Sequence, residues 1–195
     1  MHRYIKPVVF ILCLLPLVML LWNGFTHGLG ANPVEKITHR TGDWSLRFLL
    51  ITLSVTPLRK MFGWNRLLRL RRMLGLFAFF YVCLHFATYL VFDHFFDIHE
   101  IIKDIIKRPY ITVGFTGFVL LIPLAVTSTN NMRKRLGKRW QQLHQLVYVI
   151  AVCGILHYLW LVKADILKPM IHAAILLALL IVRAVYQRKE QRTTI

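Results

Sequence analysis

The sequence contains few acidic residues and few cysteines, and each shortage excludes a class of protein. Only 8 Asp and Glu accompany 25 Lys and Arg in 195 residues. No acidic residue lies well inside a long apolar run, which disfavours a transporter that relays protons on buried carboxylates. The cysteines, Cys13, Cys83 and Cys153, lie in apolar runs without a CxxC pair. We therefore expect neither a disulfide nor a metal site from them.

Motifs for nucleotide binding and for hydrolysis are also missing. The sequence has no GxGxxG, P-loop, HExxH or GxSxG. We therefore expect no substrate-converting site in this chain. Any oxidation of a pyridine nucleotide would have to take place on another protein.

Long hydrophobic runs dominate what is present. Hydrophobic residues make up 57% of the sequence and the mean hydropathy is +0.56, values too high for an ordinary soluble domain. A membrane-spanning helix needs about 20 mostly apolar residues. The pattern predicts an all-α, polytopic membrane bundle that forms a single domain over residues 1–195. The six expected spans are approximately 8–25, 44–56, 74–92, 111–127, 143–162 and 169–186.

The basic residues are unevenly shared between the two sets of connecting segments. If both termini are cytoplasmic, the inner segments have a large positive excess with Glu190 as their single acid, whereas the outer segments are balanced. This positive-inside pattern predicts cytoplasmic termini. It also favours anionic inner-leaflet lipid, and not nucleic acid, as the partner of the basic segments. The inner basic residues are Arg3, Lys6, Arg59, Lys60, Arg66, Arg69, Arg71, Arg72, Arg133, Lys134, Arg135, Lys138, Arg139, Arg183, Arg188, Lys189 and Arg192.

Two outer segments connect the expected spans at some length. Residues 26–43 are polar and rich in glycine, which is typical of a loop. Residues 93–110 instead carry isoleucines at helical spacing with charged residues between them, a pattern that predicts an amphipathic helix resting at the outer interface. A docking platform for an outer-face partner is the alternative.

Three histidines, His85, His144 and His157, lie inside apolar runs, where an ionisable side chain is costly and indicates a functional site. Histidine is also the usual axial ligand of haem iron. At about 1.5 Å per residue, His85 lies about 18 Å beyond Met73, and His157 lies about 20 Å beyond His144. His85 and His157 are thus expected at similar depth towards the outer face. We predict that they clamp one b-type haem between two helices.

The inner position is less complete. Arg71 and Arg72 stand where a partner for His144 would be expected, but a guanidinium has no lone pair for iron. The two arginines suit haem propionates or a cofactor phosphate, and ordinary inner-loop charge is an equal alternative. His144 would then serve an inner haem or another cofactor.

Helical phase and one further histidine complicate this assignment. Thirteen residues leave His144 and His157 about 140° out of phase on a regular helix, unless Gly154 permits a local distortion. His172 is expected near the depth of His157, and could replace a ligand, bond beside the haem, or simply lie at the interface.

The stretches around these residues resemble the MsrQ family of haem-binding membrane subunits, within the ferric-reductase-like transmembrane group. The most specific match is RLGKRWQQLHQLVY, part of TSTNNMRKRLGKRWQQLHQLVY at 127–148, together with GILHYLW at 154–160. The resemblance covers nearly the whole chain. Further matches are HGLGANPVE at 27–35, TPLRK at 56–60, RRMLGL at 71–76 and KRPYITVGF at 107–115.

The resemblance implies a multi-pass protein of the bacterial inner membrane that binds b-type haem, one or two per chain, with FMN as a further cofactor. It maps the family's haem-linked histidines onto His85, His144 and His157. It also implies delivery of electrons, from the quinone pool or a cytosolic flavin reductase, to a periplasmic molybdopterin enzyme that reduces methionine sulfoxide in proteins.

Three other functions stay open at the level of sequence. A stand-alone ferric reductase would discharge electrons to iron at the outer face. A transporter or channel would use the intramembrane histidines to relay protons. A structural assembly subunit is the third.

Overall fold

The computed structural model describes residues 4–162 and 165–193, and every regular element in those ranges is helical. The expected all-α class is therefore confirmed. Arg3 and Lys163 lie outside the described residues, as do the side chains of Glu190 and Arg192. The α-helices are α1 (Ile5–Phe25), α2 (Pro33–Phe62), α3 (Leu68–Thr88), α4 (Ile98–Lys107), α5 (Pro109–Val126), α6 (Asn130–Leu136), α7 (Lys138–His144), α8 (Leu146–Leu161) and α9 (Leu167–Thr193).

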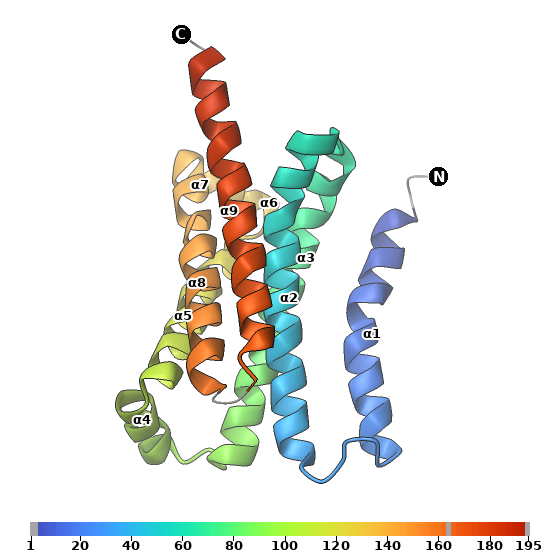
Figure 1. The fold of residues 1–195 in the computed structure, drawn as a ribbon, viewed down its shortest axis with the longest axis vertical. Helices are drawn as coiled ribbons and strands as arrows, with labels where there is room; N and C mark the ends of the chain where they lie inside the picture. The colour runs from blue at the N-terminus through green and yellow to red at the C-terminus, as the bar shows by residue number, and fades with distance from the viewer. Residues whose placement is uncertain (1–3, 163–164, 194–195) are drawn as a thin grey trace.

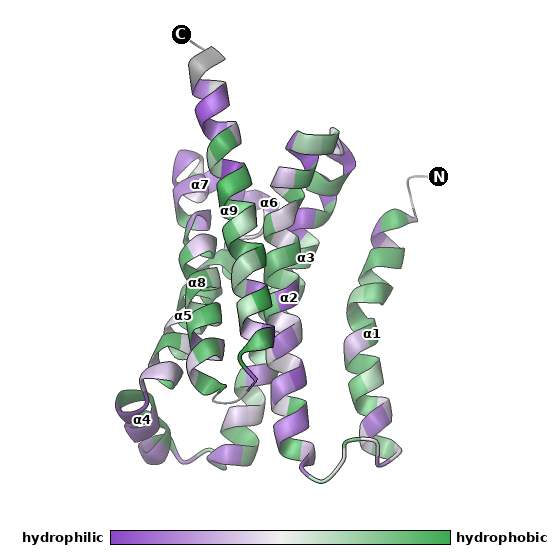
Figure 2. Ribbon diagram, in the orientation of Figure 1, coloured by the Kyte–Doolittle hydropathy of each residue, from purple (hydrophilic) through white to green (hydrophobic). Residues whose placement is uncertain are grey.

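The long helices run side by side, and both ends of the chain lie at the same end of the bundle (Figure 1). We call this end, which also carries α6, α7 and the α2–α3 connection, the terminal end. We call the opposite end, which carries α4 and the α1–α2 connection, the α4 end. Hydrophilic residues gather at both ends, and the middles of the outer helices are mostly hydrophobic (Figure 2). This banding is the one that a bilayer requires.

Five helical stretches in the described part of the chain are long and apolar enough to cross a membrane. Four of them match the predicted spans within a few residues at most ends. The stretch that corresponds to the predicted span 143–162 begins earlier, at Lys138, because α7 continues into α8 with only a turn at Gln145 between them. The five stretches are Ile5–Phe25, Asn65–Asp93, Pro109–Val126, Lys138–Leu161 and Leu167–Lys189.

The second predicted span, 44–56, was too short. Helix α2 begins at Pro33, so more than half of the segment 26–43, which was expected to form an outer loop, is helical. Asn32 caps this helix by accepting a hydrogen bond from the Glu35 N–H, and Pro33 supplies a fixed φ at the first position. Gly63 ends the helix with a φ of 70°, a left-handed conformation that glycine adopts at no steric cost. Because α2 contains many polar residues, it is not one of the five stretches that are apolar enough to cross a membrane.

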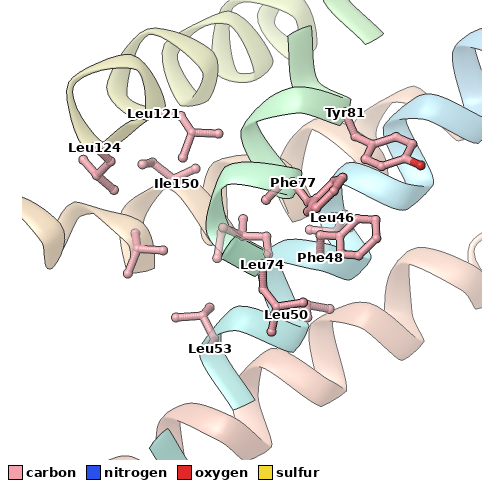
Figure 3. Packing of buried hydrophobic residues seen from close by; sticks show 14 of the residues in the cluster. Leu46, Phe48, Leu50, Leu53, Leu74, Phe77, Tyr81, Leu121, Leu124 and Ile150 are labelled. Atoms are coloured by element: carbon pink, nitrogen blue, oxygen red, sulfur yellow. The ribbon is translucent and has the colours of Figure 1, made fainter. Parts of the chain in front are cut away.

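Helix α2 nevertheless contributes more buried residues than any other helix. Its apolar face packs chiefly against α3, and also contacts α8 and α9. Phe48 stacks on Tyr81 with ring centroids 5.2 Å apart, beside Leu46, Leu50 and Phe77 (Figure 3). A helix with polar residues can therefore lie in the middle of an apolar bundle, because neighbouring helices and not lipid surround it.

Helix α1 is held at the edge by a polar contact. The Tyr81 hydroxyl accepts a hydrogen bond from the Leu17 N–H at 3.2 Å and donates one to the Cys13 carbonyl at 2.9 Å. These groups flank Pro16, which cannot donate a backbone hydrogen bond of its own. Tyr81 is 1% exposed, so the contact ties α1 to the centre of α3.

The amphipathic helix expected within residues 93–110 is confirmed as α4. Asp97 caps it by accepting from the N–H groups of His99 and Glu100. Ile101 and Asp104 are buried, whereas Ile98, Ile102 and Ile106 are exposed. Whether that apolar face meets lipid or a protein stays a prediction.

Candidate functional site

The structure places His85 and His157 next to each other inside the bundle. His85 lies on α3 and His157 on α8, with ring centroids 6.0 Å apart and ring planes inclined at 73°. Two helices that are distant in sequence therefore meet at the depth that the residue spacing predicted.

Each imidazole is held by one hydrogen bond from Nδ1 to a backbone carbonyl. His85 Nδ1 lies 3.0 Å from the carbonyl oxygen of Thr38 on α2, and His157 Nδ1 lies 2.7 Å from that of Tyr110 on α5. Because a carbonyl oxygen only accepts, each Nδ1 must carry a proton. A neutral ring then keeps a lone pair on Nε2. This is the tautomer that a second-shell carbonyl fixes in metal-binding histidines.

A glycine stands against each imidazole. A Cβ at Gly42 would lie 3.1 Å from His85 Cε1, and a Cβ at Gly114 would lie 2.6 Å from His157 Nδ1. Distances this short require something to move, so the absence of a side chain at these two positions lets each ring approach its helix.

The two halves of the site repeat one arrangement. In both, the carbonyl that accepts the bond lies 47 residues before the histidine. The glycine follows the carbonyl residue by one helical turn in both. The α2–α3 pair and the α5–α8 pair thus present their imidazoles to each other in equivalent ways.

The paired imidazoles line a cavity of about 620 Å³ between α2, α3, α5 and α8. This volume falls within the usual range for cofactor pockets, about 300–1,000 Å³. Most of its exposed wall area is apolar. Apolar lining residues include Leu46, Leu49, Val82, Phe86, Phe118 and Leu121.

A polar cluster lies at the α4 end of the cavity, where Tyr89, His94 and Arg108 are lining residues. Asp104 accepts hydrogen bonds from the Tyr89 hydroxyl at 3.1 Å and lies 3.2 Å from His94 Nε2. It also forms an ion pair with Arg108 at 2.8 Å. The hydrogen bond from Arg108 to the Tyr110 hydroxyl, with the nearby carboxylate, raises the pKa of the Arg108 guanidinium, which therefore stays charged at any working pH.

Replacement of Asp104 by alanine is expected to loosen α4. Asp104 is 8% exposed, and its loss removes the partner of the half-buried Tyr89 hydroxyl and His94 ring, at about 1 kcal/mol each. Backbone amides of α4 should exchange hydrogen about tenfold faster or more, since 1.4 kcal/mol is a factor of about ten. Hydrogen exchange read by mass spectrometry measures this.

The matched control for that experiment is Glu100→Ala on the same helix. The Glu100–Lys103 pair is about half exposed on each side, and such pairs contribute little. Equal exchange rates in the two variants would contradict the anchoring role of Asp104.

His144 lies apart from this cavity, at the terminal end. Its Nδ1 lies 3.0 Å from the Trp140 carbonyl oxygen of its own helix, and its ring stacks on Trp140 at 3.9 Å. Its Nε2 is buried and, among the described residues, makes no hydrogen bond of good geometry, although the Leu124 backbone lies near the ring. An unpartnered buried nitrogen is a group that a ligand would satisfy.

The two candidate arginines differ in their surroundings, and neither lines the large cavity. Arg72 is exposed and donates a hydrogen bond to Asn130 Oδ1 at 2.8 Å. Arg71 is half-buried and lies within electrostatic reach of His144, Tyr148 and Arg183.

The remaining sequence expectations fall outside the paired site. His172 is half-buried, with its Nδ1 2.7 Å from the Lys168 carbonyl oxygen and its ring 6.0 Å from that of Tyr158. Helix α8 runs through Gly154 without interruption, so the local helix distortion suggested at Gly154 is absent. A turn at Gln145 separates His144 from the helix of His157.

Reasoning from the sequence missed several residues of the site. It did not identify Thr38 and Tyr110 as the carbonyl partners, or Gly42 and Gly114 as the positions that admit the rings. His39 also lines the cavity. The usable signal was the repeated interval between a glycine and a histidine in two pairs of apolar segments.

The fold is that of an all-helical, multi-pass membrane protein. Two imidazoles, each hydrogen-bonded to a backbone carbonyl, line its interior cavity, which is typical of membrane proteins that bind a cofactor. The matching family model is the ferric reductase like transmembrane component, over residues 7–155. The chain therefore belongs to this family and, within it, to the MsrQ proteins.

Two relatives carry the name protein-methionine-sulfoxide reductase heme-binding subunit MsrQ. The protein from Herminiimonas arsenicoxydans is 62% identical over 92% of this chain and 84% of its own. That from Rhodospirillum rubrum is 55% identical over 96% and 91%. No solved structure matches this chain.

Proposed function

We propose that this chain is the haem-binding membrane subunit of a protein-methionine-sulfoxide reductase system, and that His85 and His157 hold one b-type haem. The observation that carries the proposal is the pair of imidazoles, each bonded through Nδ1 to a carbonyl, at the wall of one cavity. The names of the relatives supply the system.

The donor set favours haem over a free metal ion. In the described part of the chain, no cluster of three or more His, Cys, Asp or Glu forms a metal site. Two imidazoles fall short of the four ligands of an ordinary zinc site. They match the axial positions of a haem iron, whose ring supplies the other ligands.

The protein residues hold and orient the group, and the bound haem supplies one-electron chemistry. The carbonyls of Thr38 and Tyr110 fix the ring tautomers, and Gly42 and Gly114 set how close the rings come to α2 and α5. The apolar part of the cavity wall would limit the access of water to a bound haem, and together with the histidine ligands it would tune the potential.

The chain would carry electrons through the inner membrane and convert no substrate itself. The basic terminal end would face the cytoplasm, where the quinone pool or a cytosolic flavin reductase would supply electrons. The α4 end would face the periplasm and deliver them to a molybdopterin-containing methionine sulfoxide reductase. The unpartnered Nε2 of His144 supports a second cofactor at the terminal end, a haem or FMN.

Absorption spectra of the purified protein test the proposal. Oxidised and dithionite-reduced spectra should show b-type haem, and a pyridine haemochrome assay should give at least one haem per chain. A colourless protein, after expression with haem supplied, would contradict the proposal and favour the proton-relay transporter.

The direction of electron flow needs a separate measurement. The reduced protein should be re-oxidised by the periplasmic reductase with methionine sulfoxide. Re-oxidation by a ferric chelate alone, with no effect of the reductase, would instead identify a stand-alone ferric reductase.

A further inference from the structure

A second polar cluster lies at the terminal end, away from the paired histidines. Arg71 of α3 is within electrostatic reach of Tyr148 on α8 and Arg183 on α9. The Arg183 guanidinium carbon lies 4.7 Å from the centroid of the Tyr148 ring. The Arg183 guanidinium therefore covers the phenol ring, and Arg71 lies within electrostatic range of both groups. Both arginines are half-buried.

No carboxylate compensates these charges. Among the residues that the structure describes, neither Arg71 nor Arg183 forms an ion pair. Like charges that approach each other at partial burial repel, and removal from water adds to the cost. An arrangement of this kind is stabilised by an anion.

Unpartnered polar atoms point to the same ligand. Among the residues that the structure describes, the buried Tyr148 hydroxyl and the buried Arg59 Nε are donors without a hydrogen-bond partner. Thr52 lies opposite Gly75 where α2 packs on α3, so Arg59 lies about one helical turn from the level of Arg71. Buried polar groups normally have partners, and each exception requires an explanation. One oxyanion can accept from several of these donors.

We propose that Arg71, Arg183 and the Tyr148 hydroxyl bind a phosphate group at the terminal end of the bundle. The planar guanidinium fork suits phosphate oxygens, and a phosphate carries enough charge to offset more than one arginine. Two sources share this chemistry: the phosphate ester of a soluble cofactor such as FMN, and the headgroup of an anionic phospholipid. These three residues do not line the haem cavity. The phosphate site rests on the proposed function only in that it offers a location for FMN.

The neighbouring Arg72 provides a matched control. It is exposed and already bonded to Asn130, so it adds charge at the same end without reaching the cluster. Arg72→Gln therefore changes the net charge as Arg71→Gln does. Any difference between the two variants reports the cluster and not the general basic surface.

The experiment uses the full chain in phosphatidylcholine nanodiscs, with two probes. Flavin fluorescence measures the binding of FMN and of riboflavin, which lacks the phosphate, and native mass spectrometry measures retained phosphatidylglycerol. We expect the wild type to prefer FMN over riboflavin by about tenfold or to retain phosphatidylglycerol. Arg71→Gln and Arg183→Gln should reduce that binding about tenfold, and Arg72→Gln should leave it unchanged.

The outcomes separate the two sources and the two proposals. Loss of FMN binding in the cluster variants identifies a cofactor phosphate, and loss of phosphatidylglycerol identifies a lipid headgroup. Equal effects of Arg71→Gln and Arg72→Gln on both probes would overturn the site. If the variants fail to fold, the wild type decides, because equal FMN and riboflavin affinities with no retained phosphatidylglycerol overturn it too. Haem content is recorded separately, so its loss would reject the haem proposal alone.

Discussion

Replacement of His85 or of His157 by alanine is expected to remove most of the reducible haem absorbance. Each variant deletes one axial ligand and leaves a buried carbonyl, that of Thr38 or Tyr110, without its donor. Loss of a supporting partner alone typically costs 10–100-fold in metal affinity, and loss of the ligand itself should cost more. We expect the haem-to-protein ratio to fall by about tenfold or further in both variants.

Two other histidines provide the controls. His172 is half-buried and does not line the cavity, so His172→Ala should keep the wild-type spectrum. His144→Ala should spare this haem and affect only a cofactor at the terminal end. A full haem complement in both His85→Ala and His157→Ala would rule out the paired site.

The pairing of His85 with His157 could be predicted from the sequence. The depth of His85 and His157 follows from helix rise and the positions of basic loops, which need no tertiary information. The carbonyl partners could not be predicted, because Thr38 and Tyr110 each lie 47 residues before their histidine and contribute only a backbone oxygen. A backbone acceptor leaves no trace in the residue type.

The second span shows the same limit for the fold. Hydropathy underestimated α2 because several of its polar residues line the cavity and do not face lipid. Asp43 lines the cavity and lies 3.8 Å from Arg47. Only the packing of α3, α8 and α9 around α2 explains how such residues fit within the bundle.

Gly114→Ala is expected to impair haem binding through the position of His157. The added Cβ would lie 2.6 Å from His157 Nδ1, in the space through which that nitrogen donates to Tyr110. The ring must rotate or α5 must move away from α8, and either change misplaces the axial nitrogen. We expect a lower haem-to-protein ratio, or loss of the low-spin spectrum of paired histidine ligands.

The sign of this result separates geometry from helix stability. Glycine is about 1 kcal/mol less favourable than alanine inside a helix, so Gly114→Ala should stabilise α5 locally while it damages the site. Gly75→Ala gives the same helical gain, and its Cβ would meet Thr52 at an ordinary 3.6 Å. Gly75→Ala should therefore bind haem normally. In Gly42→Ala the added Cβ would lie 3.1 Å from His85 Cε1, so its loss of haem should be intermediate between those of Gly75→Ala and Gly114→Ala. Normal spectra in both Gly114→Ala and Gly75→Ala would mean that His157 holds a different position when haem is bound.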